Sequence, residues 1–214
     1  MSLENYYKEG ELEVGMDESG AGPMMGDLFL AGVILPVECP YPECQDYWDM
    51  LNDSKKLSAK KRELLFDFIP QVAIDYSIVR ISPEIIDRDN IWYCRVNGFH
   101  QVIDKLALIP THIIVDGDAF KQYYKDGEKI PYKCIDKGDT KYKSIAAASI
   151  LAKVSHDRAI VKLHEEYPQY NWKQNKGYGT QQHMDAIKQY GITKYHRRSY
   201  GICKEWESLP QNFI

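Results

Sequence analysis

Three acidic side chains stand where predicted strands end, a position from which they could act on a ligand. Asp17 and Glu18 follow the alternating apolar pattern of residues 12–16. Asp116 ends the apolar run 113–115. Acidic residues are also common in turns, so each position taken alone is compatible with a structural role. Ligands of open α/β sheets bind at strand ends, however, which makes these carboxylates candidates for catalysis.

Asp157 is a fourth candidate because of its place in the helical period. The positions i, i+4, i+7 and i+11 of one predicted helix are Ile150, Val154, Asp157 and Val161. An acid therefore lies on an otherwise apolar stripe. Burial of a carboxylate is costly and is usually resolved by an Arg or Lys partner, a raised pKa or a metal ion. A salt bridge to the adjacent Arg158 is the structural alternative.

The chemistry available to these four carboxylates is that of oxygen ligands. No pair of histidines stands beside them at the spacing of a metal site. Such a set favours a hard cation such as Mg²⁺ or Mn²⁺. Two such ions, bound to the attacking and leaving oxygens, would catalyse phosphoryl transfer.

A glycine-rich turn, Gly20-Ala21-Gly22-Pro23, follows the acidic pair after Ser19. Two glycines one residue apart let the backbone approach a ligand closely and offer N–H groups to its oxygen atoms. The next glycine is Gly26, and a strand-like segment follows it. This spacing excludes a dinucleotide-binding fingerprint and a Walker loop.

Aromatic and basic residues alternate in the last quarter of the chain. Lys176 and Tyr178 place a cation near an aromatic ring between glycines, and residues 196–200 repeat the theme. Aromatic rings beside Lys and Arg suit stacking on sugars and contact with phosphates. Such residues taken alone are more often ordinary surface.

The elements that must position these residues alternate between strands and helices. Periodicity predicts strands over residues 12–16, 28–35, 72–81, 111–115 and 132–135, and helices over 60–69, from 83 to about 108 with a break, from 143 onward, and over 180–190. Residues 12–16 and 28–35 should pair as a hairpin, and residues 121–129 are predicted to be a polar connection. The predicted class is α/β with a mixed sheet.

The composition is that of an ordinary globular protein. The chain has 214 residues, of which 44% are hydrophobic and 27% charged, and this predicts one domain. The longest apolar stretch, residues 28–35, is too short to cross a bilayer, and the acidic start lacks the features of a signal peptide. We therefore expect a cytoplasmic protein. The five cysteines form no CxxC pair, which argues against a disulfide framework or a thiolate zinc site.

Charge is divided unevenly along the chain. The net charge of -4 argues weakly against a nucleic-acid partner. Residues 1–54 contain twelve acidic residues and one lysine, whereas residues 137–198 contain twelve Lys and Arg against five acidic residues. A second basic cluster includes Lys55 and Lys56. An acidic protein divided in this way can still present a basic surface.

Six segments, taken in order, carry a resemblance to a known family. They are GMDESGAGP, NDSKKLSAKKRE, IIVDGD, KGDTKYKSIAAASILAKVSHDR, NKGYGT and HRRSYG. Over about residues 12–204 the chain resembles ribonuclease HII in its bacterial form. The resemblance implies an α/β ribonuclease H-like fold, with a mixed five-stranded sheet flanked by helices. It also implies one catalytic domain, residues 1–214, with a core of about 12–167 and a C-terminal helical extension of about 168–214.

The resemblance further implies an activity. The enzyme would hydrolyse the RNA strand of RNA/DNA hybrids and nick DNA duplexes on the 5′ side of embedded ribonucleotides, leaving 3′-hydroxyl and 5′-phosphate ends. The residues that would bind two divalent cations, Mg²⁺ or Mn²⁺, are Asp17, Glu18, Asp116 and Asp157. One ion would activate a water molecule and the other would stabilise the leaving 3′ oxygen. We expect a monomer with no organic cofactor and no membrane partner.

Substrate-binding residues follow from the same resemblance and form two groups. The readers of the 2′-hydroxyl, the group that separates RNA from DNA, would be Gly20, Ala21, Gly22 and Tyr178. The contacts to phosphate would come from Lys55, Lys56 and Lys176.

The chain departs from the family pattern at Ala21, where Arg or Lys is usual. Main-chain contacts can persist there, but a charge-assisted contact to phosphate is lost, at a cost of about 1.5 to 3 kcal/mol. His156 stands where Arg is common, and Tyr200 where Phe is common. Two alternatives follow: another two-metal nuclease of this fold that acts on DNA, and a hybrid-binding protein with impaired catalysis. Retention of all four acids argues against the second.

Overall fold

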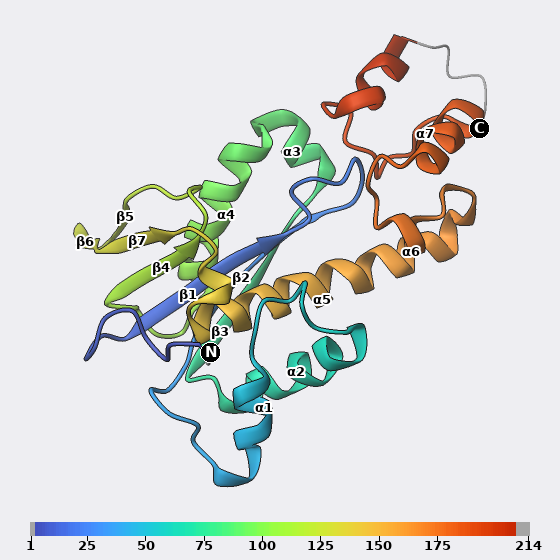
Figure 1. Ribbon diagram of the computed structural model, residues 1–214. Coiled ribbons are helices and arrows are strands. Elements are labelled where there is room, and N and C mark those ends of the chain that lie inside the picture. Colours follow the sequence, from blue (N-terminus) through green and yellow to red (C-terminus); the bar gives the residue numbers. More distant parts are fainter. Residues whose placement is uncertain (1–2, 209–214) are drawn as a thin grey trace.

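A mixed five-stranded β-sheet lies at the centre of the protein (Figure 1). The computed structural model describes residues 3–208 of the 214-residue chain. The strands are β1 (Glu13–Ser19), β2 (Leu28–Ile34), β3 (Asp75–Ile81), β4 (His112–Asp116) and β7 (Tyr132–Ile135), in the order β3-β2-β1-β4-β7. β1 and β2 form the predicted antiparallel hairpin, β3 extends it, and β4 runs parallel to both β1 and β7. The predicted mixed five-stranded sheet is confirmed.

Helices cover both faces of this sheet, and shorter elements connect them. The α-helices are α1 (Gln45–Met50), α2 (Ala59–Val72), α3 (Pro83–Asp89), α4 (Ile91–Lys105), α5 (Lys143–Glu166), α6 (Trp172–Asn175) and α7 (Gln181–Tyr190). The 3-10 helices are η1 (Pro42–Cys44), η2 (Gly138–Thr140), η3 (Pro168–Tyr170) and η4 (Gly201–Ser208). A separate two-stranded ribbon consists of β5 (Tyr123–Lys125) and β6 (Glu128–Ile130).

The observed elements differ from the predicted ones at several points. α2 continues through Val72, so the third predicted strand begins only at Asp75. The β5–β6 ribbon occupies part of residues 121–129, predicted as a polar connection. The short helix α1 is not predicted at all.

The predicted break in the long helical segment falls at Asn90. Its φ of 71° ends α3. Its side chain accepts a hydrogen bond of 2.9 Å from the N–H of Trp92 and so caps α4. An Asn tolerates this backbone conformation and also supplies the capping oxygen, which explains why one residue separates two helices.

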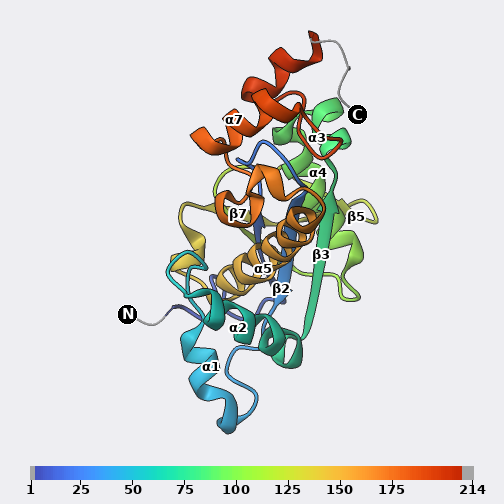
Figure 2. The same cartoon turned by 90° about the vertical axis from the view of Figure 1, so that its right-hand side faces the viewer.

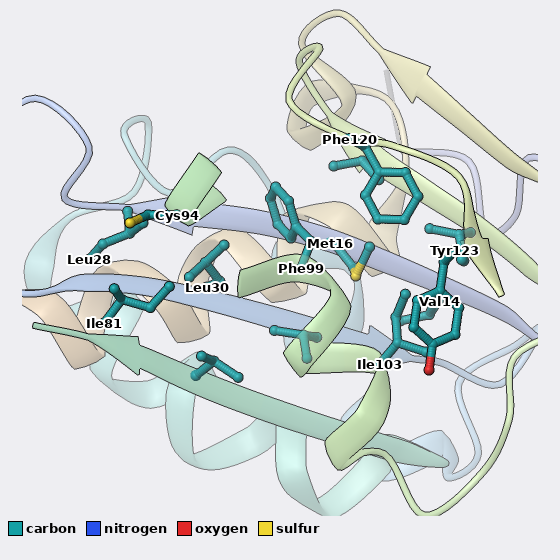
Figure 3. Close-up of a cluster of buried hydrophobic side chains, with 14 of the residues drawn as sticks. Val14, Met16, Leu28, Leu30, Ile81, Cys94, Phe99, Ile103, Phe120 and Tyr123 are labelled. Carbon is teal, nitrogen blue, oxygen red and sulfur yellow. The ribbon is translucent and has the colours of Figure 1, made fainter. Parts of the chain in front are cut away.

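Helices lie on both faces of the sheet (Figures 1 and 2), and alternation along the strands assigns the side chains to these two faces. Val14 and Met16 of β1 pack with Phe99 of α4 in one apolar cluster (Figure 3). Ala31 of β2 packs on the other face with Ala147 of α5 and with residues of α2. The molecule therefore has three layers, with α4 on one side and α2 and α5 on the other. This arrangement decides which way each acid of a strand points.

Helix α5 passes close to β1 because of a glycine. A side chain at Gly15 would collide with the backbone and the Oγ of Ser144, at the start of α5. The close approach brings the polar residues of α5 to the level of the acids in β1. This spacing between α5 and β1 determines which residues of the two elements can meet in the site described below.

The chain after α5 packs at one end of the sheet (Figures 1 and 2). Its apolar cluster contains Trp172, Ile187 and Cys203 together with Met24 and Met25, from the connection between β1 and β2. α5 ends near the predicted boundary at about residue 168, and the division into core and extension stays a prediction. All five cysteines are free. None of the described helices is long and apolar enough to span a membrane.

Candidate active site

Asp17 and Glu18 lie within β1 and point to opposite faces of the sheet. Because Met16 faces α4, alternation turns Asp17 toward α5 and Glu18 toward α4. Asp17 lies beside Ser149 of α5. Oε1 of Glu18 forms an ion pair of 2.8 Å with Nε of Arg95, on α4. The strand continues to Ser19, past its predicted end at residue 16, so the two carboxylates approach the end of the sheet from different sides.

Asp116 ends β4 directly beside Asp17. The parallel register pairs Met16 with Val115, which makes Asp17 and Asp116 the next residues along the two strands. Burial raises the pKa of Asp17 well above its usual value, and the charges of Glu18 and Asp116 raise it further. Three of the four predicted carboxylates thus share one electrostatic environment at the ends of β1 and β4.

A further carboxylate, Asp139, joins these three although the sequence analysis does not single it out. It lies in η2, which is separated by residues 136–137 from β7, and β7 runs parallel to β4. The N–H of Gly138 donates a 2.6 Å hydrogen bond to Oδ1 of Asp116 and holds Asp139 near that carboxylate. Burial, followed by the charges of Asp116 and Asp53, raises the pKa of Asp139 to about 6. Its place just after predicted strand 132–135 is the signal that could have found it.

Asp157 lies farther along α5. Ser149 is the α5 residue beside Asp17, and Asp157 follows it by eight residues, which corresponds to about 12 Å of helix. Nζ of Lys153 donates a 2.7 Å hydrogen bond to Oδ1 of Asp157. Burial acts to raise the pKa of Asp157, but hydrogen bonds from His156 and Lys153 outweigh it and lower the pKa to about 2. The metal-binding role of Asp157 stays a prediction. The geometry favours Asp139 as the fourth acid beside Asp17, Glu18 and Asp116.

A pocket of about 430 Å³ opens beside Asp157, between α2 and α5. Arg62 and Lys176 line it, and Nη2 of Arg62 lies 3.9 Å from Oδ2 of Asp157. The salt bridge considered between Asp157 and Arg158 is not formed, because Arg158 pairs with Glu63 instead. Lys176, one of the predicted phosphate contacts, thus belongs to the surroundings of Asp157 rather than to the group at the strand ends.

The acids at the strand ends fit a hard divalent cation. Oε2 of Glu18 is buried and has no hydrogen-bond partner among the described residues. Asp17 accepts a 2.7 Å hydrogen bond from the N–H of Glu18, yet burial and two neighbouring carboxylates still raise its pKa. A divalent cation would supply the compensation that buried carboxylates need, through the oxygen ligands it prefers. Within residues 3–208, no three such side chains converge into a preassembled ligand cluster. Glu18 is turned to Arg95, and Asp116 to the N–H of Gly138.

Two positive charges accompany these carboxylates. Burial raises the pKa of Glu18, and the attraction of Arg95 opposes this rise. Arg95 is a site residue that sequence reasoning misses, because a lone Arg in an amphipathic helix carries no motif. Lys55, a predicted phosphate contact, exerts a favourable charge interaction on both Glu18 and Asp139.

The loop that carries Lys55 and Lys56 is held against α5. Oγ of Ser54 lies 2.9 Å from Oγ of Ser149, the residue beside Asp17. The N–H of Lys55 donates a 2.8 Å hydrogen bond to Oδ1 of Asp53. Both lysine side chains are exposed. Two basic side chains are therefore available to a ligand directly beside the carboxylates.

The predicted turn after β1 offers free main-chain donors. Gly20 has a φ of 95°, and a Cβ there would lie 2.6 Å from Cδ2 of His156, so the position requires glycine. The N–H groups of Ala21 and Gly22 donate to no residue in the described part of the chain. Cε1 of Tyr178 would lie 3.2 Å from a Cβ on Gly22, and half of the Tyr178 side chain is exposed. The turn and this ring therefore form one surface.

The family model of ribonuclease HII matches residues 14–203 of this chain. The chain belongs to the ribonuclease HII family. Ribonuclease HII of Christiangramia forsetii is 46% identical over 201 residues, which cover 94% of this chain and 96% of the relative. Ribonuclease HII of Bacteroides thetaiotaomicron is 40% identical over 208 residues, which cover 97% and 98%.

Solved structures of the ribonuclease HII type share the fold. Ribonuclease H2 from Pyrococcus horikoshii OT3 is similar with a TM-score of 0.74 at 26% identity, over 91% of this chain and 96% of that one. The PCNA:RNase HII complex from Archaeoglobus fulgidus contains a chain with a TM-score of 0.69 at 25% identity, over 95% and 98%. The predicted ribonuclease H-like fold is confirmed. The protein is a ribonuclease H, an endonuclease of the hydrolase class that acts on RNA/DNA hybrids.

Proposed function

We propose that this ribonuclease HII nicks DNA duplexes on the 5′ side of embedded ribonucleotides, as well as cutting the RNA strand of hybrids. The products would carry 3′-hydroxyl and 5′-phosphate ends. Asp17, Glu18, Asp116 and Asp139 would hold two divalent cations, Mg²⁺ or Mn²⁺. The observation that supports this most is that the ends of three mutually parallel strands bring these acids into one electrostatic group. Asp157, predicted from the resemblance, is the alternative fourth ligand.

The two ions, when bound, would activate the attacking water and stabilise the leaving 3′ oxygen. The protein's own part is to supply ionised carboxylates at fixed positions. Because the pKa values of Asp17 and Asp139 are raised in the metal-free protein, binding of the ions requires these groups to release protons.

The turn after β1 would distinguish RNA from DNA. The N–H groups of Ala21 and Gly22 are free to meet an oxygen of the ribonucleotide, and the exposed ring of Tyr178 lies against Gly22. The 2′-hydroxyl can both donate and accept hydrogen bonds, so the Tyr178 ring and the two N–H donors would recognise that group. The donors are main-chain groups, which the small side chain of Ala21 leaves in place.

Basic residues would bind the duplex backbone on both sides of the carboxylates. Lys55 and Lys56 are exposed on the loop beside Asp17. Lys176 lines the pocket that contains Arg62. Contacts of this kind are independent of sequence and weaken as salt displaces them. We further propose that the protein acts as a monomer in the cytoplasm, without an organic cofactor.

The deciding experiment is cleavage of a labelled DNA duplex that contains one ribonucleotide. It is run with Mg²⁺, with Mn²⁺ and with EDTA, beside an all-DNA duplex and a long hybrid, and with the Asp17→Asn variant. The proposal expects a metal-dependent nick 5′ of the ribonucleotide, no cleavage of all-DNA, and loss of turnover in Asp17→Asn.

Other outcomes point to the alternatives. Cleavage of all-DNA would favour a nuclease with another substrate, and binding without cleavage of any RNA-containing duplex would favour a protein with impaired catalysis. Cleavage of the long hybrid alone would mean that recognition of the single ribonucleotide is lost with the cation missing at Ala21.

A further inference from the structure

We propose that Arg197 and Tyr200 are positioning residues that fix the main chain of the turn after β1, residues 20–26, and thereby orient its free N–H donors. The proposal rests on the proposed function for the role of this turn. Neither residue touches the carboxylates. Both come from the chain after α5, about 170 residues away in sequence.

Arg197 is fully buried and directs its whole guanidinium group at this turn. Its hydrogen bonds go to the carbonyl oxygens of Gly20 (2.6 Å from Nη2), Ala21 (3.1 Å from Nη1), Pro23 (2.8 Å from Nη1) and Gly26 (3.0 Å from Nε and 2.9 Å from Nη2). A guanidinium has five N–H donors. All five are therefore used on four carbonyls of one turn.

The surroundings of Arg197 indicate that its role is to bind the carbonyl oxygens of this turn. Burial lowers the pKa of the guanidinium, while Asp27 and Asp87 attract it electrostatically. No ion pair to Arg197 is formed within residues 3–208. A buried cation without a carboxylate partner is costly unless its donors are satisfied. The turn satisfies them, and the same bonds hold the turn in one conformation.

Fixing a carbonyl also fixes the next N–H. The peptide bond is planar and trans, so the C=O of one residue and the N–H of the next point in opposite directions. The carbonyls of Gly20 and Ala21 point inward to Arg197, which turns the N–H groups of Ala21 and Gly22 away from it. These are the two donors that no described residue uses.

Tyr200 holds the same turn at a second point. Its hydroxyl donates a 3.0 Å hydrogen bond to the carbonyl of Ala21, which Arg197 also contacts. The ring lies 5.1 Å from Cζ of Arg197, a cation–π distance. Two of the three residues at which this chain departs from the family pattern, Ala21 and Tyr200, are thus in direct contact.

The segment that carries both residues is anchored independently of the turn. Asp87 of α3 accepts hydrogen bonds from the N–H of Arg198 at 2.8 Å and from the N–H of Ser199 at 2.9 Å. The hydroxyl of Ser199 donates to the same carboxylate. Arg197 and Tyr200 therefore act from a fixed support, which a positioning role requires.

The test compares two tyrosines of the same region. Tyr200→Phe removes one hydroxyl bonded to the carbonyl of Ala21. Tyr170→Phe removes one hydroxyl bonded, at 2.9 Å, to the carbonyl of Gly191, away from the turn. Both are assayed on the duplex with one ribonucleotide, with thermal midpoint and half-saturating Mn²⁺ concentration measured for each.

The expected result is selective. Loss of one such hydrogen bond corresponds to about a three- to ten-fold change, so Tyr200→Phe should lower kcat/KM by that factor through a higher KM. Tyr170→Phe should stay within about two-fold of the parent, with a comparable fall in thermal midpoint. Half-saturating Mn²⁺ should be unchanged in both. Equal kinetics for the two variants, or parent-like kinetics for Tyr200→Phe, would overturn the proposal.

A second measurement does not depend on activity. Met24 and Gly26 donate their N–H groups to Gly177 and Tyr195 across the base of the turn. Arg197→Lys keeps the positive charge but loses the planar guanidinium that contacts four carbonyls of the turn. The rate of amide hydrogen exchange at Met24 and Gly26 should therefore rise at least ten-fold more than at residues of β2. A uniform rise in exchange rate across the protein, or no rise, would contradict the positioning role of Arg197. Absence of cleavage by the parent protein would instead remove the proposed function and leave this exchange result standing.

Discussion

The N–H of Gly138 donates a 2.6 Å hydrogen bond to Oδ1 of Asp116, and this bond ties the segment after β7 to the end of β4. Gly138 permits it because a Cβ there would lie 2.6 Å from Cδ1 of Ile145. The next residue, Asp139, is thereby held among the strand-end acids, with only 5% of its surface exposed. The segment after β7 therefore both anchors Asp116 and places the carboxylate of Asp139 beside it.

Asp139→Asn is expected to lower kcat by on the order of 10²-fold or more, since a neutral amide cannot replace a charged oxygen ligand. Asp157→Asn is expected to stay within about ten-fold of the parent, because its carboxylate already pairs with Lys153. Cleavage of the ribonucleotide-containing duplex at saturating Mn²⁺ measures both variants side by side.

The pair of variants also tests the assignment made from the family resemblance. If Asp157→Asn abolishes cleavage and Asp139→Asn does not, Asp157 is the fourth ligand and the geometric assignment is wrong. Circular dichroism of both variants checks that neither has unfolded.

Asp139→Asn is expected to stabilise the metal-free protein at neutral pH. The pKa of Asp139 rises from an ordinary value of 3.8 to about 6 on folding, so folding favours the protonated form. The stability gained is complete below pH 3.8 and is lost as the pH rises through 6. At pH 7.5 the ionised group lowers the free energy of unfolding by about 3 kcal/mol relative to a neutral isostere. Urea unfolding in EDTA at pH 7.5 and pH 4 measures the difference.

Asp157→Asn provides the control of opposite sign. The pKa of Asp157 falls from 3.8 to about 2 on folding, so its ionised form contributes stability above pH 3.8 that is lost as the pH falls through 2. This variant should lose about 2 kcal/mol at pH 7.5, and the loss should disappear below pH 2. A loss of stability in both variants at pH 7.5 would contradict the environment derived for Asp139.

Apolar runs in the sequence mark approximately where β1 and β4 end, although β1 continues to Ser19, past its predicted end at residue 16. Asp17, Glu18 and Asp116 could be selected in this way, and the parallel register of β1 and β4 confirms that Asp17 and Asp116 lie together. Asp139 could not be selected with the same ease, since three residues separate it from the end of the short strand β7. Its convergence with the others depends on the pairing of β7 with β4, which no local pattern encodes.

Helical periodicity was less reliable than strand ends for the site. The stripe that contains Asp157 is buried at Ile150 and Val154 but only half-buried at Asp157 itself. The fully covered face of α5 passes instead through His156 and Ile160. A shift of one residue decides whether an acid lies on the buried face of α5 or at the edge of that face, where it can form a salt bridge. The sequence alone does not determine which residues of the helix are buried. Arg197 was likewise hidden, because its partners are carbonyls from a distant turn.

Gly22→Ala is expected to weaken substrate binding without loss of stability. The added Cβ would lie 3.2 Å from Cε1 of Tyr178, so the exposed ring must shift. We expect KM for the ribonucleotide-containing duplex to rise about ten-fold, which corresponds to about 1.4 kcal/mol. The thermal midpoint should change by less than that of Gly20→Ala, where a φ of 95° and a contact of 2.8 Å with the carbonyl of Asp27 cause strain.

The mechanism of this effect is checked by removing the ring. In a Tyr178→Ala background, Gly22→Ala should have little further effect on KM, because the atom it displaces is gone. Strict additivity of the two substitutions would show that Gly22 acts independently of Tyr178.

Ala21→Arg is expected to strengthen binding by restoring a cation beside the turn. A charge-assisted contact to phosphate should lower KM about ten-fold at 50 mM salt. Salt screens such contacts, so the gain should shrink steeply by 200 mM. Ala21→Gln, which is long and polar but uncharged, is the matched control. If Gln lowers KM as much as Arg, or the gain is independent of salt, the turn in this chain does not use a phosphate contact at residue 21 and relies on its main-chain donors.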